Sequence, residues 1–142
     1  MNETGELLKC VYKNAKTAIE AIDMLISKTS SEEFLNLLEN QREEYFLIIQ
    51  KCNALMEGRR MLPPNVGMMS RVGTGMTIWL NSVNSRNTNR MAEVMISGST
   101  EGMIELSRML NSLHDADNFA RALAHKLMII EENNVRLMQD FV

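Results

Sequence analysis

Residues 30–58 have the sequence SSEEFLNLLENQREEYFLIIQKCNALMEG, and this stretch decides the fold. Its apolar side chains recur at three- and four-residue intervals, which is the pattern of a helix with one buried face. Ser30 followed by Glu33 predicts a capping box at the start of this helix, and Gly58 predicts its end. The expected buried stripe is Phe34, Leu38, Gln41, Tyr45, Ile48, Cys52 and Leu55.

The preceding segment, residues 4–27, has the same periodicity and is predicted to be a helix with Thr4 as its N-cap. Only residues 28–31 separate the two helices, and so short a turn favours an antiparallel hairpin. The expected stripe of the first helix is Leu8, Val11, Ala15, Ala18, Ile22 and Leu25.

Two prolines, Pro63 and Pro64, interrupt helical structure after the hairpin. A short helix is predicted over residues 66–83, in the middle of a long connection. It has three glycines, Gly67, Gly73 and Gly75. Each weakens a helix in isolation by about 1 kcal/mol relative to alanine.

Two further helices are predicted downstream, over residues 88–113 and from Asp115 or Asp117 to Phe141. The expected buried side of the helix over 88–113 is Met91, Met95, Gly98, Gly102, Leu106, Met109 and Leu113. Its two glycines are interpreted as small residues that let a neighbouring helix approach closely. The expected stripe of the latter is Phe119, Leu123, Leu127, Ile130, Leu137 and Phe141.

These segments predict an all-α fold, an antiparallel four-helix bundle with a long crossover that carries a short extra helix. The 142 residues suit a single domain, with one hairpin over 4–57, the crossover over 58–87 and a second hairpin over 88–141. Aromatic residues make up 5% of the chain, whereas 13 residues are Met, so the core should be aliphatic and adaptable.

Composition excludes several classes of function. A net charge of −3 is a poor match for nucleic acid. No uncharged apolar run approaches the roughly 20 residues that span a bilayer, and the polar residues Met1 to Thr4 do not resemble a signal peptide. We therefore expect a cytoplasmic protein without membrane association. Its two cysteines, Cys10 and Cys52, are expected to be reduced thiols, since their side chains should diverge.

The chain resembles the ferritin-like superfamily, in particular small bacterial four-helix proteins of that class. The resemblance rests on the helix lengths, the long connection, and segments that include QREEY (41–45), AEVMISG (92–98) and IEENNV (130–135). It implies the bundle fold and a di-metal site, which needs a Glu from each of two helices and a Glu-x-x-His from each of the other two.

The residues of that di-metal motif are not in place. Glu44 is followed by Leu47 at the histidine position, and Glu131 is followed by Asn134. The resemblance leaves Glu44, Glu93 and Glu131 as candidate metal ligands, but we expect no intact metal site, no cofactor and no catalytic residue. The alternative is a ferritin-like, metal-binding oxidoreductase with non-standard ligands.

Three amides interrupt the apolar stripes: Gln41, Asn133 and Asn134. A buried amide must find partners or cost about 1–3 kcal/mol. If these residues meet inside the bundle, they form a hydrogen-bonded layer that fixes the alignment of the helices. For Asn133 and Asn134, a position at the edge of the stripe, in contact with water, is an equal alternative.

The crossover differs from the rest of the chain in the sign of its charge. Residues 58–92 carry five Arg and no Asp, Glu or Lys, which leaves −8 for the rest of the chain. Trp, Met and Arg are enriched at protein interfaces. The chain is therefore expected to be a non-catalytic interaction or oligomerising protein that forms a dimer through the crossover. The candidate partner-binding residues are Met69, Arg71, Met76, Trp79 and Arg86.

Overall fold

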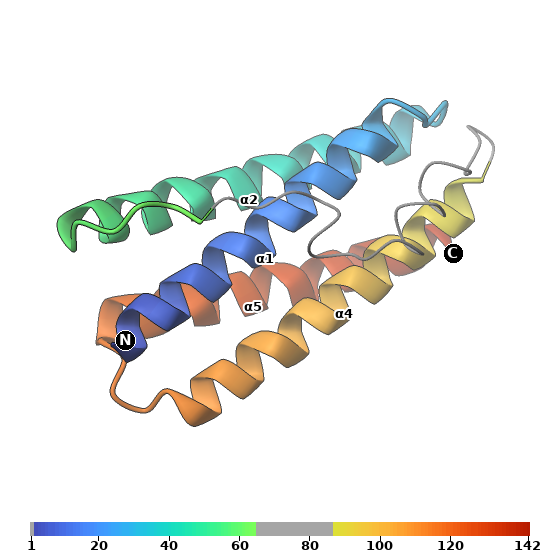
Figure 1. Ribbon diagram of the computed structural model, residues 1–142. Coiled ribbons are helices and arrows are strands. Elements are labelled where there is room, and N and C mark those ends of the chain that lie inside the picture. Colours follow the sequence, from blue (N-terminus) through green and yellow to red (C-terminus); the bar gives the residue numbers. More distant parts are fainter. Residues whose placement is uncertain (1, 65–86) are drawn as a thin grey trace.

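The computed structural model describes residues 2–64 and 87–142 of the chain. Within these ranges it contains four long helices and no strand, which confirms the predicted all-α bundle (Figure 1). The helices are α1 (Glu3–Ile26), α2 (Glu32–Gly58), α4 (Thr88–Ser112) and α5 (Asn118–Met138), and a 3₁₀ turn, η1 (Gln139–Phe141), follows α5. The helix predicted over 66–83 lies outside the described residues.

Contacts at the two ends of the bundle define the directions of the helices. The Asp117 amide donates to the Thr4 hydroxyl at 2.9 Å, and Arg59 pairs with Asp117, so the start of α1, the end of α2 and the start of α5 meet at one end. At the other end, the rings of Phe34 and Phe141 lie 5.2 Å apart. Hence α1 and α5 run in one direction, and α2 and α4 run in the other (Figure 1).

Each hairpin packs against the other along its length. Helix α1 contacts α2, α4 and α5, and α5 contacts α2 and α4. Helices α2 and α4 end at the same end of the bundle, so the start of α4 lies at the opposite end from the last residues of α2 (Figure 1). None of the described helices combines the length and the apolar character that crossing a bilayer requires.

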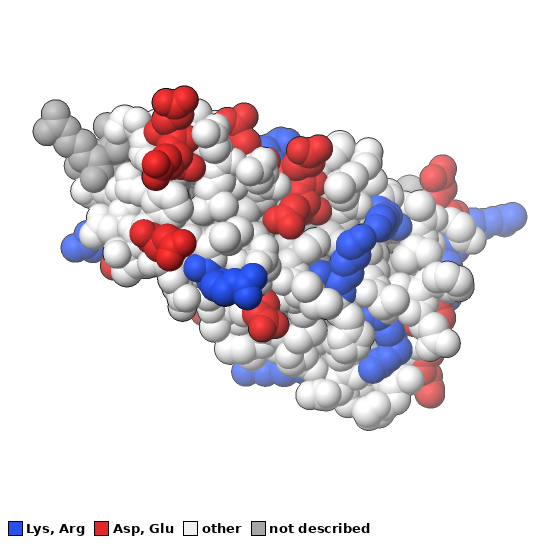
Figure 2. Space-filling model, turned by 180° about the vertical axis from the view of Figure 1, so that it is seen from behind, with Lys and Arg blue, Asp and Glu red and all other residues white. Residues whose placement is uncertain are grey.

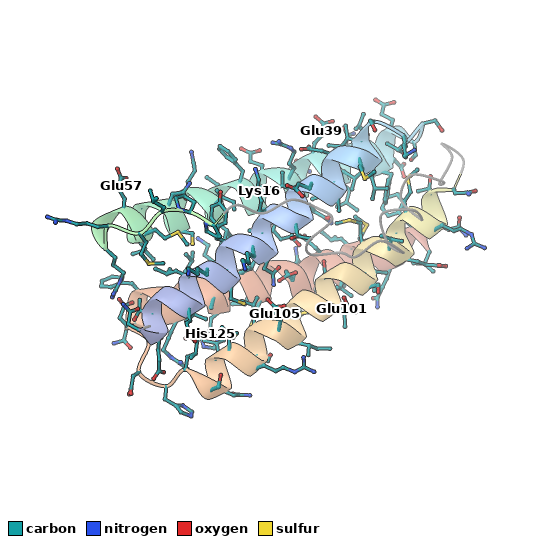
Figure 3. All side chains as sticks on the ribbon, in the orientation of Figure 1. Lys16, Glu39, Glu57, Glu101, Glu105 and His125 are labelled. Atoms are coloured by element: carbon teal, nitrogen blue, oxygen red, sulfur yellow. The ribbon has the colours of Figure 1, made fainter. Side chains whose placement is uncertain are left out.

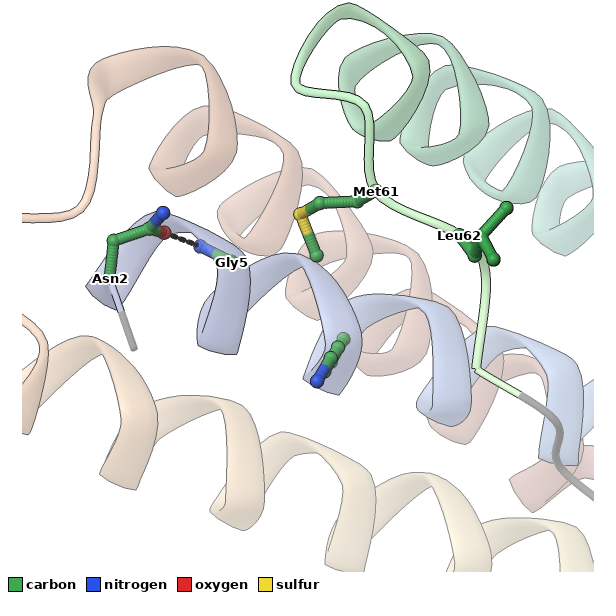
Figure 4. A pocket seen from close by; sticks show the side chains of 5 residues that line it. Asn2, Gly5, Met61 and Leu62 are labelled. Atoms are coloured by element: carbon green, nitrogen blue, oxygen red, sulfur yellow. Dashed lines mark hydrogen bonds between the residues drawn. The ribbon is translucent and has the colours of Figure 1, made fainter.

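The start of α1 differs from the prediction by two residues. The N-cap is Asn2, whose side-chain oxygen accepts the Gly5 amide at 2.5 Å. Thr4 is instead buried within the first turn. Figure 4 shows this corner, where the Met61 methyl group lies 3.5 Å from the position of a Cβ on Gly5. The segment after α2 thus covers the start of α1, and Leu62 and Lys9 complete a shallow pocket there.

The boundaries of α2 are also shifted. Ser31, rather than Ser30, caps the helix and accepts the Phe34 amide at 3.2 Å. Gly58 is the last helical residue, and the left-handed residue that ends the helix is Arg60, with φ of 57°. The Asp117 cap of α5 is confirmed, because its carboxylate accepts the Ala120 amide at 2.8 Å.

The stripes of α1, α2 and α4 are largely as predicted, whereas the stripe of α5 agrees only at Leu123 and Leu127. Phe119 and Leu137, predicted to be buried, are 75% and 39% exposed. A displacement of one residue turns a helix face by about 100°. In α4, Ser99 and Leu110 are buried in the places predicted for Gly98 and Met109. The buried residues of α5 are Ala120, Leu123, Ala124, Leu127, Glu131, Asn134 and Met138.

The two cysteines are not joined, as expected, and they point toward different helices. The Cys10 thiol donates to a Glu105 carboxylate oxygen at 3.2 Å, whereas the Cys52 thiol donates to the Leu8 carbonyl oxygen at 3.3 Å. Burial raises the pKa of Cys52 to about 12, so its thiol is protonated at neutral pH.

The burial of both thiols predicts slow modification of the native protein. At pH 8, Ellman's reagent should react with neither Cys10 nor Cys52 until denaturant is added, after which both should react at once. Rapid native reaction of Cys52, identified by mass spectrometry of the modified peptide, would show that α1 and α2 do not enclose it.

Candidate functional site

Six polar side chains from all four described helices are buried inside the bundle. We call them the polar layer: Asn14 of α1, Gln41 and Tyr45 of α2, Ser99 of α4, and Glu131 and Asn134 of α5. None is more than 6% exposed. Buried polar groups are costly unless they find partners, so this layer is where a structural or a functional reason is needed.

The carboxyl group of Glu131 packs against the backbone of α4 at Gly102. A Cβ on Gly102 would stand 2.6 Å from a Glu131 carboxyl oxygen and 2.9 Å from the amide atoms of Asn14. The Asn14 amide donates to the Gly102 carbonyl oxygen at 3.1 Å. Gly102 is therefore the small residue that the sequence predicted, and it makes room for two side chains. Gly98 has nothing within 4 Å of a Cβ, so that part of the prediction is wrong.

Tyr45 joins α2 to the same layer. Burial raises the pKa of its hydroxyl above the ordinary value, and the nearby Glu131 carboxylate raises this pKa further. The side chains of Asn134 and Ser99 approach the hydroxyl and act in the opposite direction. None of these contacts within the described residues has the geometry of a full hydrogen bond to the hydroxyl. Tyr45 is therefore a neutral phenol at neutral pH.

The three predicted amides have different outcomes. Gln41 and Asn134 are each 1% exposed, so both lie inside the bundle. The predicted hydrogen bonding of Gln41 is not seen, because neither of its amide atoms has a partner among the described residues. Asn133 lies at the edge of the buried stripe of α5, where it is partly exposed, and its side-chain oxygen accepts a hydrogen bond from Arg136. The alternative of a position in contact with water therefore holds for Asn133.

The three candidate metal ligands do not form one site. Glu131 is buried, Glu44 is half-buried and Glu93 is exposed. No three His, Cys, Asp or Glu side chains group together within residues 2–64 and 87–142. In Figure 3, His125 lies toward one end of the bundle and Glu39 toward the other. The described residues therefore do not fit a ferritin-like di-metal centre, which needs four carboxylates and two imidazoles.

A different arrangement lies on the outer side of α2 and α5. Three large apolar side chains are exposed there: Leu47 at 50%, Phe119 at 75% and Ile129 at 68%. Between the two helices runs an open groove of about 370 Å³, lined by Lys51, Ala54, Leu55, Phe119, Ala122, Leu123 and Lys126. We call this surface, with Leu47 and Ile129, the α2/α5 face.

Both kinds of charge occur on this side of the molecule, and the two lysines beside the groove lie together. Lys51 and Lys126 lie close together, and the Lys126 side chain, within hydrogen-bonding reach, lowers the pKa of Lys51. Figure 2 views the molecule from this side, and most of its acidic side chains lie over the half nearer the turn between α1 and α2. Basic side chains surrounded by uncharged ones lie in the other half.

Sequence reasoning missed Asn14, Ser99 and the burial of Glu131. Asn14 lies three residues after Val11, on the stripe of α1, so its position carried the signal. Ser99 and Glu131 each lie one residue after a position that was predicted to be buried, Gly98 and Ile130, so neither was on a predicted stripe. The predicted docking residues, Met69, Arg71, Met76, Trp79 and Arg86, all lie outside the described residues.

One solved structure, described as a DUF305 fragment from Deinococcus radiodurans, is similar to this chain, with a TM-score of 0.79 and 12% sequence identity. The similarity covers 99% of this chain and 95% of that chain. No family model matches the sequence, and no curated protein does. At this identity the similarity shows a common helical-bundle fold and carries no activity with it.

The packing around Gly102 predicts opposite effects for two glycines of the same helix. Gly102→Ala should destabilise the protein by about 1–3 kcal/mol, because the new methyl group overlaps Glu131 and Asn14. Gly98→Ala is the matched control and should stabilise by up to about 1 kcal/mol, since alanine favours a helix and the site is open. Urea unfolding monitored by circular dichroism measures both, and equal effects would contradict the packing.

The partial burial of the Glu44 carboxyl group predicts that the stability of the protein depends on pH. Burial raises the pKa of its carboxyl above the ordinary value of 4.5, so the folded chain favours the protonated form. The stabilising contribution is therefore present below pH 4.5 and is lost as the pH rises through the folded pKa.

Glu44→Gln should consequently raise Tm at pH 7, and the difference from the wild type should shrink below pH 4.5. Glu57→Gln, at an exposed position of the same helix, is the control and should change Tm less at pH 7. A Glu44→Gln effect that does not change with pH would exclude this carboxyl as the source.

Proposed function

We propose that this chain is a non-catalytic interaction protein that associates with itself. The supporting observation is the α2/α5 face, where Leu47, Phe119 and Ile129 leave large apolar side chains in water. Single exposed apolar residues are ordinary on protein surfaces, but a group of them along one groove is typical of an interaction site. The crossover residues predicted to mediate self-association lie outside the described residues, so the proposal rests on the α2/α5 face.

The interior supports a non-catalytic role. Tyr45 and Glu131 are the ionisable residues of the polar layer, and they are 0% and 1% exposed. A general acid or base must reach a proton on a substrate, and buried groups like these do not. His114 and His125 are exposed on the surface, away from this layer. The layer is better suited to aligning four helices than to turning over a substrate.

The ferritin-like resemblance remains part of this proposal at the level of architecture. Two antiparallel hairpins joined by a long connection are the arrangement of that superfamily. The oxidoreductase alternative has less support, because its ligands would have to be Glu131 and Glu44 with amide oxygens. Elemental analysis of protein purified without chelator tests it, and about two iron or manganese ions per chain would favour the alternative.

Self-association is tested by a charge placed on the α2/α5 face. Ile129→Glu should leave the thermal stability of the protomer within about 0.5 kcal/mol, because the side chain is exposed. It should weaken the dimer about tenfold or more, which is about 1.4 kcal/mol, because the carboxylate must be desolvated at an apolar contact. Sedimentation velocity over a range of concentrations measures the dissociation constant.

Ile104→Glu is the matched control, because Ile104 is a 46% exposed isoleucine on α4, outside the α2/α5 face. It should leave the dimer unchanged. A wild type that sediments as a monomer at every concentration would contradict self-association.

A further inference from the structure

The α2/α5 face has the charges of a surface that can pair with a copy of itself. Leu47 lies four residues after Glu43 and four residues before Lys51, which is about 6 Å along the helix in each direction. Residues 43 and 51 are turned by only about 80° from each other, so all three side chains share one side of α2. All three are exposed.

Helix α5 continues this pattern across the groove. The two helices are antiparallel, with Lys51 beside Lys126, and with Glu44 beside Asn134 about two turns further along. The level of Leu47 on α2 therefore corresponds to about residue 130 on α5. Ile129, at 68% exposure, lies at that level, so Leu47 and Ile129 form an apolar centre for the face.

We propose that a second copy of this chain docks on the α2/α5 face, about a two-fold axis that crosses the helices at Leu47. This geometry rests on the proposed self-association and specifies its surface. The axis places α2 antiparallel to α2 of the partner, so Lys51 of each copy faces Glu43 of the other. The exposed Ile129 and Leu47 side chains of the two copies then meet at the centre.

The alternative axis, parallel to the helices, would place the lysines of one copy against the lysines of the other. Like charges across an interface oppose association, whereas the crossing axis pairs opposite charges twice. A foreign acidic partner would neutralise the lysines as well, but it would leave Glu43 without a basic counterpart. The complement that both Lys51 and Glu43 require is on this chain, and for that reason a second copy is the occupant that the charges favour.

This arrangement predicts an unusual result for two charge reversals. Lys51→Glu alone places two carboxylates, the new one and Glu43, against each other at both contacts. Glu43→Lys alone likewise places two ammonium groups, the new one and Lys51, against each other at both contacts. Each variant should be at least about tenfold weaker than the wild type in self-association. In an equal mixture of the two variants, a heterodimer places the glutamates of one variant opposite the lysines of the other at both contacts. This heterodimer should therefore form with close to wild-type affinity.

The experiment is sedimentation velocity of each variant and of the mixture, with one variant carrying a fluorescent label. Circular dichroism melts show that each protomer is folded. Arg108→Glu, a reversal at an exposed position on α4, is the control and should remain a dimer. Recovery of the dimer only in the mixture supports the two-fold pairing of Lys51 with Glu43.

The two levels of the proposal fail in different ways. If the wild type is monomeric, self-association and this geometry both fall. If the wild type and both single variants are equally dimeric, self-association stands and the α2/α5 face is excluded as its surface. If both variants are monomeric and the mixture is monomeric too, the face contributes to association, but the pairing of Lys51 with Glu43 is wrong.

Discussion

The enclosed carboxyl group of Glu131 is the constraint around which the described helices are arranged. A carboxyl group removed from water costs several kcal/mol unless polar groups surround it. Here the surroundings come from three other helices: Asn14 of α1, the backbone of α4 at Gly102, and Tyr45 of α2. An apolar core tolerates small rotations of its helices, whereas a layer of this kind admits few alternatives. The polar layer therefore fixes which side of each helix faces inward.

The same constraint determines what the surface shows. Because α5 is one continuous helix, turning Glu131 and Asn134 inward sets the direction of every other side chain along it. Ile129, two residues before Glu131, is rotated by about 200° and lies in water. Phe119, twelve residues earlier, is rotated by about 120° and lies at the edge of the groove beside Lys126. The apolar side chains of the α2/α5 face are thus exposed as a consequence of the buried polar ones, which connects the interior of the bundle to its proposed dimer surface.

Much of the fold could be predicted from the sequence, because the stripes of α1 and α2 consist of large apolar residues at regular spacing. The helix after Asp117 could not be oriented in the same way. Its large residues, Phe119 and Leu137, suggest one face, whereas its buried side begins with Ala120 and Ala124 and continues through Glu131. Alanine marks a buried helix face only weakly in a sequence pattern, and a glutamate on that face indicates exposure although it is buried. Only the tertiary contact with Gly102 shows which face is inside.

The candidate sites were predictable to a smaller extent. The burial of Gln41 followed from its position on an apolar stripe, whereas the stripe left an exposed edge position equally open for Asn134. The partners of a buried amide depend on other helices and have no local signal. The α2/α5 face was not anticipated, because Phe119 was predicted to be buried and Leu47 and Ile129 lie outside the predicted stripes. The predicted docking residues of the crossover stay a prediction, and the surface inferred from the described helices stands on separate observations.

The central claim is that Glu131 and Gly102 specify each other, and a double-mutant cycle tests it most directly. Gly102→Ala is compared in the wild type and in Glu131→Ala, with the free energy of unfolding measured in urea. Removal of the Glu131 side chain should make room for the methyl group that Gly102→Ala introduces, so the two changes should be coupled by about 0.5–3 kcal/mol. If the two effects add to within about 0.5 kcal/mol, the carboxyl group does not determine the packing of α4 against α5, and the account is contradicted.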